Sequence, residues 1–185
     1  MKKTVLKFGL ISGAMLAAFM FATLPFMDSI GFDYGLVVGY TGMVLAFLLV
    51  FFGIRSYRDN AGGGHITFWR GLKVGLLIVL VASVCYVIAW EIVYFNFIPD
   101  FVEKYTNYMV EKERAAGASA EQIAQTIEKM NSMKSLLDNP FTHAALVFLE
   151  PLPVGLLMTL ISAALLRRRP APEVDGPERL EQSAA

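Results

Sequence analysis

The sequence predicts an all-α integral membrane protein: a bundle of four transmembrane helices, with an extracytoplasmic α-helical hairpin between the third and fourth spans. Hydrophobic residues make up 56% of the 185 residues and charged residues only 17%, whereas about a quarter of the residues of a soluble domain are charged. Four apolar stretches are also long enough to cross a hydrocarbon core about 30 Å thick, which takes about 20 residues of helix. We therefore place the chain in a membrane.

The four predicted spans cover about residues 7–27, 34–54, 72–98 and 140–167. Residues 8–27 and 34–54 carry no charge, residues 74–99 contain only Glu91, and residues 140–166 contain only Glu150. The first span also has the charged start and apolar run of a secretory signal peptide. However, Met20 stands where cleavage after Ala22 would need a small residue. We expect this segment to be retained as a transmembrane helix.

Lysine and arginine are distributed unequally between the two sides of the predicted bundle. Cytoplasmic segments of membrane proteins carry the excess of these residues. Eleven of the sixteen lie before the first span, between the second and third spans, or after the fourth: Lys2, Lys3, Lys7, Arg55, Arg58, Arg70, Lys73, Arg167, Arg168, Arg169 and Arg179. We therefore predict a multi-pass membrane protein with both termini in the cytoplasm. Residues 1–169 form its transmembrane domain, and residues 170–185 a disordered cytoplasmic tail.

Residues 100–139 are predicted to form two antiparallel helices outside the membrane. Apolar side chains recur at helical spacing in both halves of this segment, and the pattern breaks at residues 116–119. Local signals mark the helix ends: Gly117 as a left-handed C-cap, Ser119 with Gln122 as a capping box, and Asn139 with Pro140 as the N-cap and first turn of the fourth span. The apolar stripes of the hairpin must pack against each other or against the bundle.

Small residues recur four positions apart in every predicted span. They are Gly9, Gly13 and Ala17; Gly35 and Gly39; Gly71 and Gly75; and Gly155, Thr159 and Ala163. This spacing places them on one face of each helix and lets helix backbones approach closely within lipid. Two uses remain open, since the same faces serve packing within one bundle and contact between two copies in a homodimer.

Glu91 and Glu150 form a candidate intramembrane polar site, because a charged side chain within a span is costly and by default suggests a function. Counted along straight helices from the cytoplasmic boundary, seventeen residues lead from Val74 to Glu91 and sixteen from Leu166 to Glu150. At about 1.5 Å per residue, both carboxylates would lie about 25 Å from that boundary. The sequence therefore predicts that they lie at one level, in a shared site open to the outside.

Five further residues belong to this candidate site: Trp90, Tyr94, His143, Pro151 and Pro153. The first three are potential hydrogen-bond partners of the carboxylates. The two prolines lack the N–H that continues a helix, which predicts a kink or break in the fourth span beside Glu150. Three roles remain open for the glutamates: a structural tie that pins the hairpin to the bundle, binding of a proton or a cation, and recognition of a lipid or small solute.

The composition also argues against several function classes. Sixteen basic and sixteen acidic residues balance, so no overall basic field favours nucleic acid. One cysteine and two histidines are too few for a zinc site built from those ligands, and we expect no metal or cofactor. No nucleophile, base and orienting residue can be combined into a catalytic site, so we do not expect an enzyme.

Several segments together carry a family resemblance. They are Leu6-Lys-Phe-Gly-Leu, Gly39-Tyr-Thr-Gly-Met-Val, Gly53-Ile-Arg-Ser-Tyr-Arg-Asp with Gly62-Gly63, Phe68 to Gly75, Tyr86-Val-Ile-Ala-Trp, Tyr105 to Ala118, and Glu150-Pro-Leu-Pro-Val-Gly. Over about residues 2–169 the chain resembles a bacterial membrane family, domain-of-unknown-function family 4199. The resemblance implies a four-helix inner-membrane protein of unknown activity.

The sequence leaves two function classes open. The first is a non-enzymatic accessory or binding protein whose outer hairpin engages a protein partner or a lipid. The second is a small secondary transporter or ion-coupled module that uses Glu91 and Glu150. The second class requires a homodimer or larger oligomer, because four helices are few for a transport path.

Overall fold

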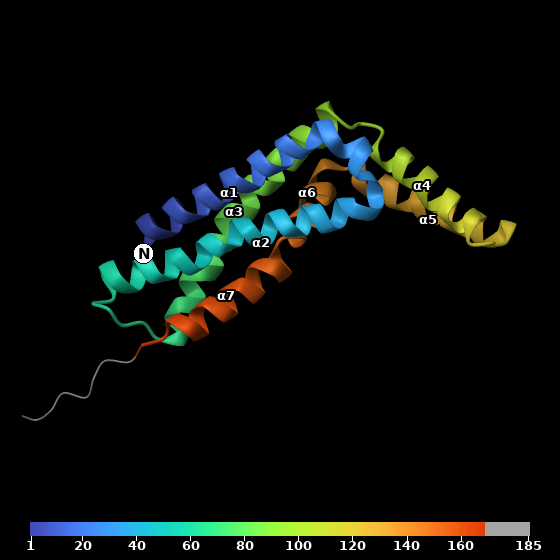
Figure 1. Ribbon diagram of the computed structural model, residues 1–185. Helices are drawn as coiled ribbons and strands as arrows, with labels where there is room; N and C mark the ends of the chain where they lie inside the picture. Colours follow the sequence, from blue (N-terminus) through green and yellow to red (C-terminus); the bar gives the residue numbers. More distant parts are fainter. Residues whose placement is uncertain (169–185) are drawn as a thin grey trace, which may run out of the picture.

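The computed structural model describes residues 1–168, and every regular element of that part is a helix (Figure 1). The elements are α1 (Lys2–Thr23), the 3₁₀ helix η1 (Leu24–Phe26), α2 (Met27–Ala61), α3 (Phe68–Asn96), α4 (Phe101–Ala115), α5 (Ala120–Leu137), α6 (Pro140–Leu149) and α7 (Leu152–Leu166). The predicted all-α class is confirmed. The tail predicted over residues 170–185 lies outside the described residues.

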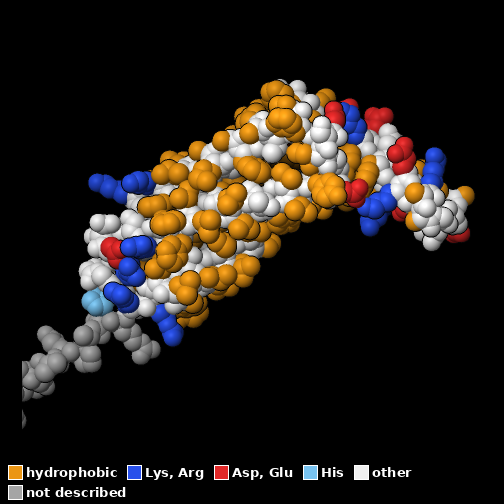
Figure 2. Space-filling model, in the orientation of Figure 1, with side chains coloured by type: hydrophobic (Ala, Val, Ile, Leu, Met, Phe, Trp, Pro, Cys, Tyr) orange, Lys and Arg blue, Asp and Glu red, His pale blue; other side chains and the backbone are white. Residues whose placement is uncertain are grey.

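Three helical stretches of the described part are long and apolar enough to cross a membrane: Lys2–Ala61, Phe68–Asn96 and Pro140–Leu166. Large hydrophobic side chains cover the outside of the bundle, as Figure 2 shows, and Leu157 and Leu165 are among the most exposed. A soluble protein does not expose apolar surface of this extent, because contact with water makes it unfavourable. The structure therefore agrees with the membrane protein that the composition predicts.

The 60-residue stretch Lys2–Ala61 contains two helices that pack side by side, α1 and α2. The chain reverses direction between them, at η1 and the first turn of α2 (Figure 1). Gly31 lies just after this reversal with φ 65° and ψ 173°, a backbone conformation that only glycine adopts readily. The side chain of Ser12 then ties the two helices together by donating to the carbonyl oxygen of Ala46, at 3.2 Å.

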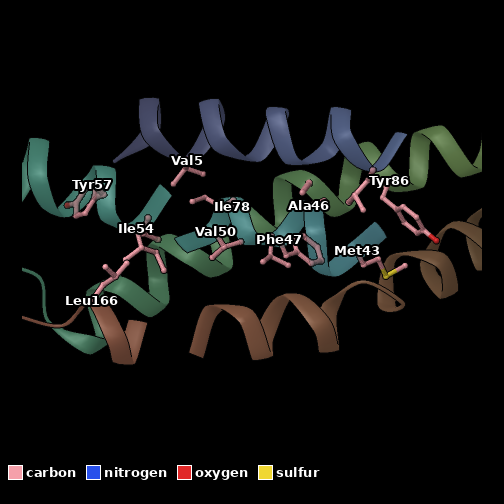
Figure 3. Packing of buried hydrophobic residues seen from close by; sticks show 14 of the residues in the cluster. Val5, Met43, Ala46, Phe47, Val50, Ile54, Tyr57, Ile78, Tyr86 and Leu166 are labelled. Atoms are coloured by element: carbon pink, nitrogen blue, oxygen red, sulfur yellow. The ribbon is translucent and has the colours of Figure 1, made fainter. Parts of the chain in front are cut away.

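Helix α3 lies at the centre of the bundle and packs against α1, α2, α6 and α7. Its buried residues Val74, Ile78, Val79 and Ala82 have 0–1% of their surface exposed. Side chains from α1, α2 and α7 meet those of α3 in one hydrophobic core (Figure 3). The members labelled in Figure 3 are Val5, Met43, Ala46, Phe47, Val50, Ile54, Tyr57, Ile78, Tyr86 and Leu166.

Most of the small residues are used for packing within the bundle. A Cβ atom added at Gly155 of α7 would lie 2.4 Å from Cγ1 of Val79, and one added at Gly75 of α3 would lie 2.5 Å from Cγ2 of Thr159. By contrast, a Cβ atom added at Gly35 or Gly39 of α2 would have no other atom within 4 Å. Packing within one bundle therefore explains the predicted small residues of α1, α3 and α7, but not Gly35 and Gly39 of α2.

The α4–α5 hairpin extends from one end of the bundle (Figure 1), and its two helices pack against each other. Its predicted local signals are confirmed. Gly117 has φ 80°, the capping box of Ser119 and Gln122 is complete, and Asn139 caps α6 by accepting from two backbone N–H groups. These three signals fix the end of α4, the start of α5 and the start of α6.

The predicted break beside Glu150 is also confirmed. Helix α6 ends at Leu149 and α7 begins at Leu152. The N–H of Glu150 donates to the carbonyl of Val147 at 3.3 Å, a tighter turn than the α-helical pattern of four residues. Pro151 and Pro153 cannot continue the helix because they lack an N–H.

We expect Gly155→Ala to destabilise the protein, because the added methyl group would meet the stiff, β-branched side chain of Val79. Overpacking of this kind costs about 1–3 kcal/mol. Gly39→Ala is the matched control, since its methyl group would meet nothing within the chain. Unfolding of both variants in nanodiscs measures the difference, and equal losses for the two would contradict this packing.

Candidate functional site

Two polar contacts join α3 to α6 at the hairpin end of the bundle. The outer contact brings Nδ1 of His143 to 2.8 Å from Oε1 of Glu91. In the inner contact, the hydroxyl of Tyr86 donates to Oε2 of Glu150 at 2.8 Å. Each glutamate thus has a partner of its own on the opposite helix.

The two carboxylates lie at different levels, which differs from the shared level that the sequence predicts. Tyr86 precedes Glu91 by five residues, and His143 precedes Glu150 by seven, so the inner contact lies roughly 7–10 Å deeper in the bundle. The two residues used as starting points, Val74 and Leu166, do not lie at one depth. Ala163 of α7 packs opposite Gly71 of α3, so Leu166 lies nearer than Val74 to the end of the bundle opposite the hairpin.

His143 is enclosed by the last turns of α3. Only 2% of its surface is exposed, and its ring centroid lies 4.3 Å from that of Tyr94. The Nε1–H of Trp90 donates to Nε2 of His143 at 3.4 Å. An indole N–H can only donate, so Nε2 carries a lone pair, and the ring proton of a neutral imidazole resides on Nδ1. The ring proton therefore lies on the side of Glu91.

The contact between His143 and Glu91 is short but not well aligned. Although 2.8 Å separates Nδ1 from Oε1, the two groups lack the geometry of a regular hydrogen bond, and neither atom has another partner. Charge attraction depends on separation more than on alignment, so the two groups interact strongly at this distance whenever both are charged. The Glu91 side chain is 22% exposed and that of His143 only 3%. The contact is therefore open to the outside of the protein at the carboxylate and closed at the ring.

The prolines of the predicted site have different environments. Pro151 is fully buried beside Glu150, whereas Pro153 is exposed in the first turn of α7. Trp90 and Tyr94 contact the ring of His143 rather than serving as hydrogen-bond donors to a carboxylate. The structure therefore gathers Glu91, His143, Trp90 and Tyr94 into one cluster and leaves Glu150 with Tyr86 in another.

Aromatic side chains connect the outer cluster to the hairpin. Phe101, the first residue of α4, packs edge-on against Trp90 and Tyr94, with ring centroids 5.9 Å and 6.4 Å apart. Phe101 also contacts Phe32 of α2, at 5.8 Å, and Tyr105 of α4, at 6.3 Å. The base of α4 is thus held by rings from α2 and α3.

An exposed ion pair provides a second tie between α2 and the hairpin. The Nζ of Lys112 donates to Oδ1 of Asp33 at 2.8 Å, and the hydroxyl of Tyr108 donates to the same oxygen. The hydrogen bond from Lys112, followed by that from Tyr108, holds the pKa of the Asp33 carboxyl below its ordinary value. Sequence reasoning missed this pair, because 79 residues separate its members; the acidic first outer loop, facing a segment with lysines, was the only available signal.

Among the described residues, no group of three or more histidine, cysteine, aspartate or glutamate side chains is placed to hold a metal ion. In comparisons with known proteins, the model of a family described as "Protein of unknown function (DUF4199)" matches residues 7–168. No curated protein and no solved structure matches the chain.

We expect the tie at Asp33 to weaken in acid. Because its folded-state pKa is depressed, its contribution is complete above the ordinary aspartate pKa of about 3.9 and is lost as the pH falls through the lower, folded-state value. Spin labels at Val37 of α2 and Glu111 of α4, in a Cys85→Ser background, report the spread of distances between the two helices.

The distribution should be narrow at neutral pH, and a separate step of broadening should follow below about pH 4, where Asp33 takes up its proton. Asp33→Asn should broaden it at neutral pH as well. Asp59→Asn is the control, since Asp59 pairs with Arg58 outside the hairpin region. A narrow distribution in the Asp33 variant would contradict the role of this pair.

Proposed function

Because the chain belongs to the DUF4199 family of proteins of unknown function, we propose its role from its own structure: a four-span protein of a bacterial inner membrane that acts as a non-enzymatic accessory or binding protein. In this proposal the α4–α5 hairpin lies outside the cytoplasm and engages a protein partner or a lipid. One observation carries this proposal. The packing of Phe101 and the ion pair of Asp33 with Lys112 attach the hairpin to the bundle, while the outer face of α5 stays uncovered.

The lengths of the helices support four spans. Helix α1 has 22 residues, α2 has 35 and α3 has 29, and about 20 suffice to cross a bilayer. Helices α1 and α2 pack side by side within Lys2–Ala61, so each forms one span. Helices α6 and α7 together form the fourth span, Pro140–Leu166, with its break at Glu150.

The distribution of charge supports the orientation. Figure 2 shows lysine and arginine side chains gathered at the end of the bundle opposite the hairpin, beyond the apolar belt, whereas the hairpin carries charges of both signs. The basic residues of that end are Lys2, Lys3, Lys7, Arg55, Arg58, Arg70, Lys73, Arg167 and Arg168. Positive charge marks the cytoplasmic side of membrane proteins, so we place this end in the cytoplasm.

The outer face of α5 supports a binding role for the hairpin. A shallow, open hollow of about 530 Å³ lies along this helix, lined by Ala124, Ile127, Glu128, Asn131 and Ser132. Ile127 is 39% exposed there. We propose that Ile127 and its polar neighbours in this hollow meet the other molecule.

A second candidate function is a small secondary transporter or ion-coupled module that uses Glu91 and Glu150 as a homodimer. The contact of Glu91 with buried His143 favours it, since paired ionisable residues within a membrane mark ion and proton paths. The uncovered glycine face of α2, at Gly35 and Gly39, offers a surface for the second copy.

The proposed topology predicts that a reporter fused after Lys129 lies outside the cytoplasm. A reporter fused after Gly63, in the loop between α2 and α3, should lie inside it. Paired fusions of alkaline phosphatase and green fluorescent protein measure both positions. A cytoplasmic signal from the Lys129 fusion would overturn the orientation.

The proposed binding surface predicts a specific cross-link from α5. A photo-reactive amino acid at Ile127 should give one defined adduct in native membranes, and mass spectrometry identifies it as protein or lipid. Lys129 is the matched control, because it lies on the same helix outside the hollow. No adduct at Ile127, or the same adducts at both positions, would argue against this surface.

A further inference from the structure

The cluster around His143 holds a single proton between two ionisable side chains. Trp90 donates to Nε2, which leaves the neutral ring with its proton on Nδ1, 2.8 Å from the Glu91 carboxylate. With Glu91 ionised, this arrangement satisfies the indole N–H and gives the carboxylate its only close partner. The cluster can take up one more proton, and the position of Trp90 determines how the ring responds to it.

A second proton on the ring would reside on Nε2 and would point at the N–H of Trp90. Two donors cannot share a hydrogen bond, and the indole has no lone pair to offer. The Trp90 side chain must therefore turn away from His143 when the imidazole becomes charged. Protonation thus exchanges one hydrogen bond for an ion pair between His143 and Glu91.

Some groups around the His143 ring favour its charged form, and others oppose it. The Glu91 carboxylate stabilises an imidazolium, and so does the ring of Tyr94 at 4.3 Å, within the reach of a cation–π contact. Burial and the Trp90 N–H oppose it.

Other elements contribute only charges farther from the ring. The C-cap residue of α5, Asp138, lies close enough for its charge to act on Tyr94. At the start of α4, Asp100 pairs with Lys104. On α6 itself, Glu150 is bound to Tyr86 about two turns further in.

A movement of Trp90 would reach the hairpin directly. Trp90 and Tyr94 both pack against Phe101 at the base of α4, and Phe101 in turn packs against Phe32 and Tyr105. When the indole turns, Phe101 loses one of the rings that hold it.

We propose that His143 and Glu91 form a proton-binding site, and that protonation of His143 releases Trp90 and loosens the base of the hairpin. The ligand of this site is a proton taken up from the side on which the hairpin lies. Protonation would thus regulate the hairpin that the proposed function makes the binding element. The site rests on the contacts of His143, and only its consequence for partner binding rests on the proposed function.

The full chain offers a direct test, since it contains two histidines and two tryptophans. With His65→Gln, His143 is the only imidazole, and ¹⁵N NMR of the protein in nanodiscs reports its protonation and tautomer. We expect the Nδ1–H tautomer at high pH and uptake of one proton by the ring as the pH is lowered. A ring that stays neutral throughout, or the Nε2–H tautomer, would overturn the site.

With Trp69→Phe, Trp90 is the only indole, and its fluorescence should change with the same midpoint. Glu91→Gln removes the carboxylate that would pair with the charged ring, so the midpoint of the fluorescence change should move. Glu103→Gln, an exposed carboxylate on α4, is the control and should leave it unchanged.

The spread of distances between labels at Val37 and Glu111 should widen over the same pH range. Titration of His143 without a change in Trp90 fluorescence and in these distances would overturn the coupling. These measurements use no partner and no lipid ligand, so their failure is distinct from failure of the cross-link at Ile127.

Discussion

A helix in lipid gains little by burying apolar side chains against another helix, because the lipid tails are equally apolar. Close approach of backbones must replace that driving force. Here α3 provides it, with Val79 seated on Gly155 and Thr159 seated on Gly75. This packing holds α7 against α3, while the break at Glu150 lets α6 follow a separate path toward the hairpin. The contacts of Glu91 and Glu150 at the hairpin end of the bundle depend on how α6 and α7 lie against α3.

The same constraint explains why polar groups meet in pairs. Inside an apolar bundle a carboxylate without a partner is costly, and α3 and α6 each supply one glutamate and one partner for the other. Glu91 meets His143 near the surface, and Glu150 meets Tyr86 further in. The outer pair lies beneath the aromatic rings that seat the hairpin, which makes its protonation state matter for the hairpin. The inner pair lies at the break and supports α6 where the helix cannot continue.

The features that local chemistry determines were predictable from the sequence. Hydropathy predicts the apolar stretches, capping signals predict the starts of α5 at Ser119 and of α6 at Asn139, and the prolines predict the break. The contacts between distant residues were not. The pairing of Asp33 with Lys112 and the different levels of the two glutamates depend on how α3, α6 and α7 slide against one another, and no local pattern encodes that register. The orientation, the partner and the oligomeric state remain predictions.

Double-mutant cycles test most directly whether the two glutamates form separate contacts. The cycles combine Glu91→Gln with His143→Gln, Tyr86→Phe with Glu150→Gln, and Glu91→Gln with Glu150→Gln, with the free energy of unfolding measured in nanodiscs. Contacting residues couple by about 0.5–3 kcal/mol. The structure predicts coupling of this size within each pair and less than about 0.5 kcal/mol between Glu91 and Glu150. Strong coupling between the two glutamates would contradict it and would restore a single shared site.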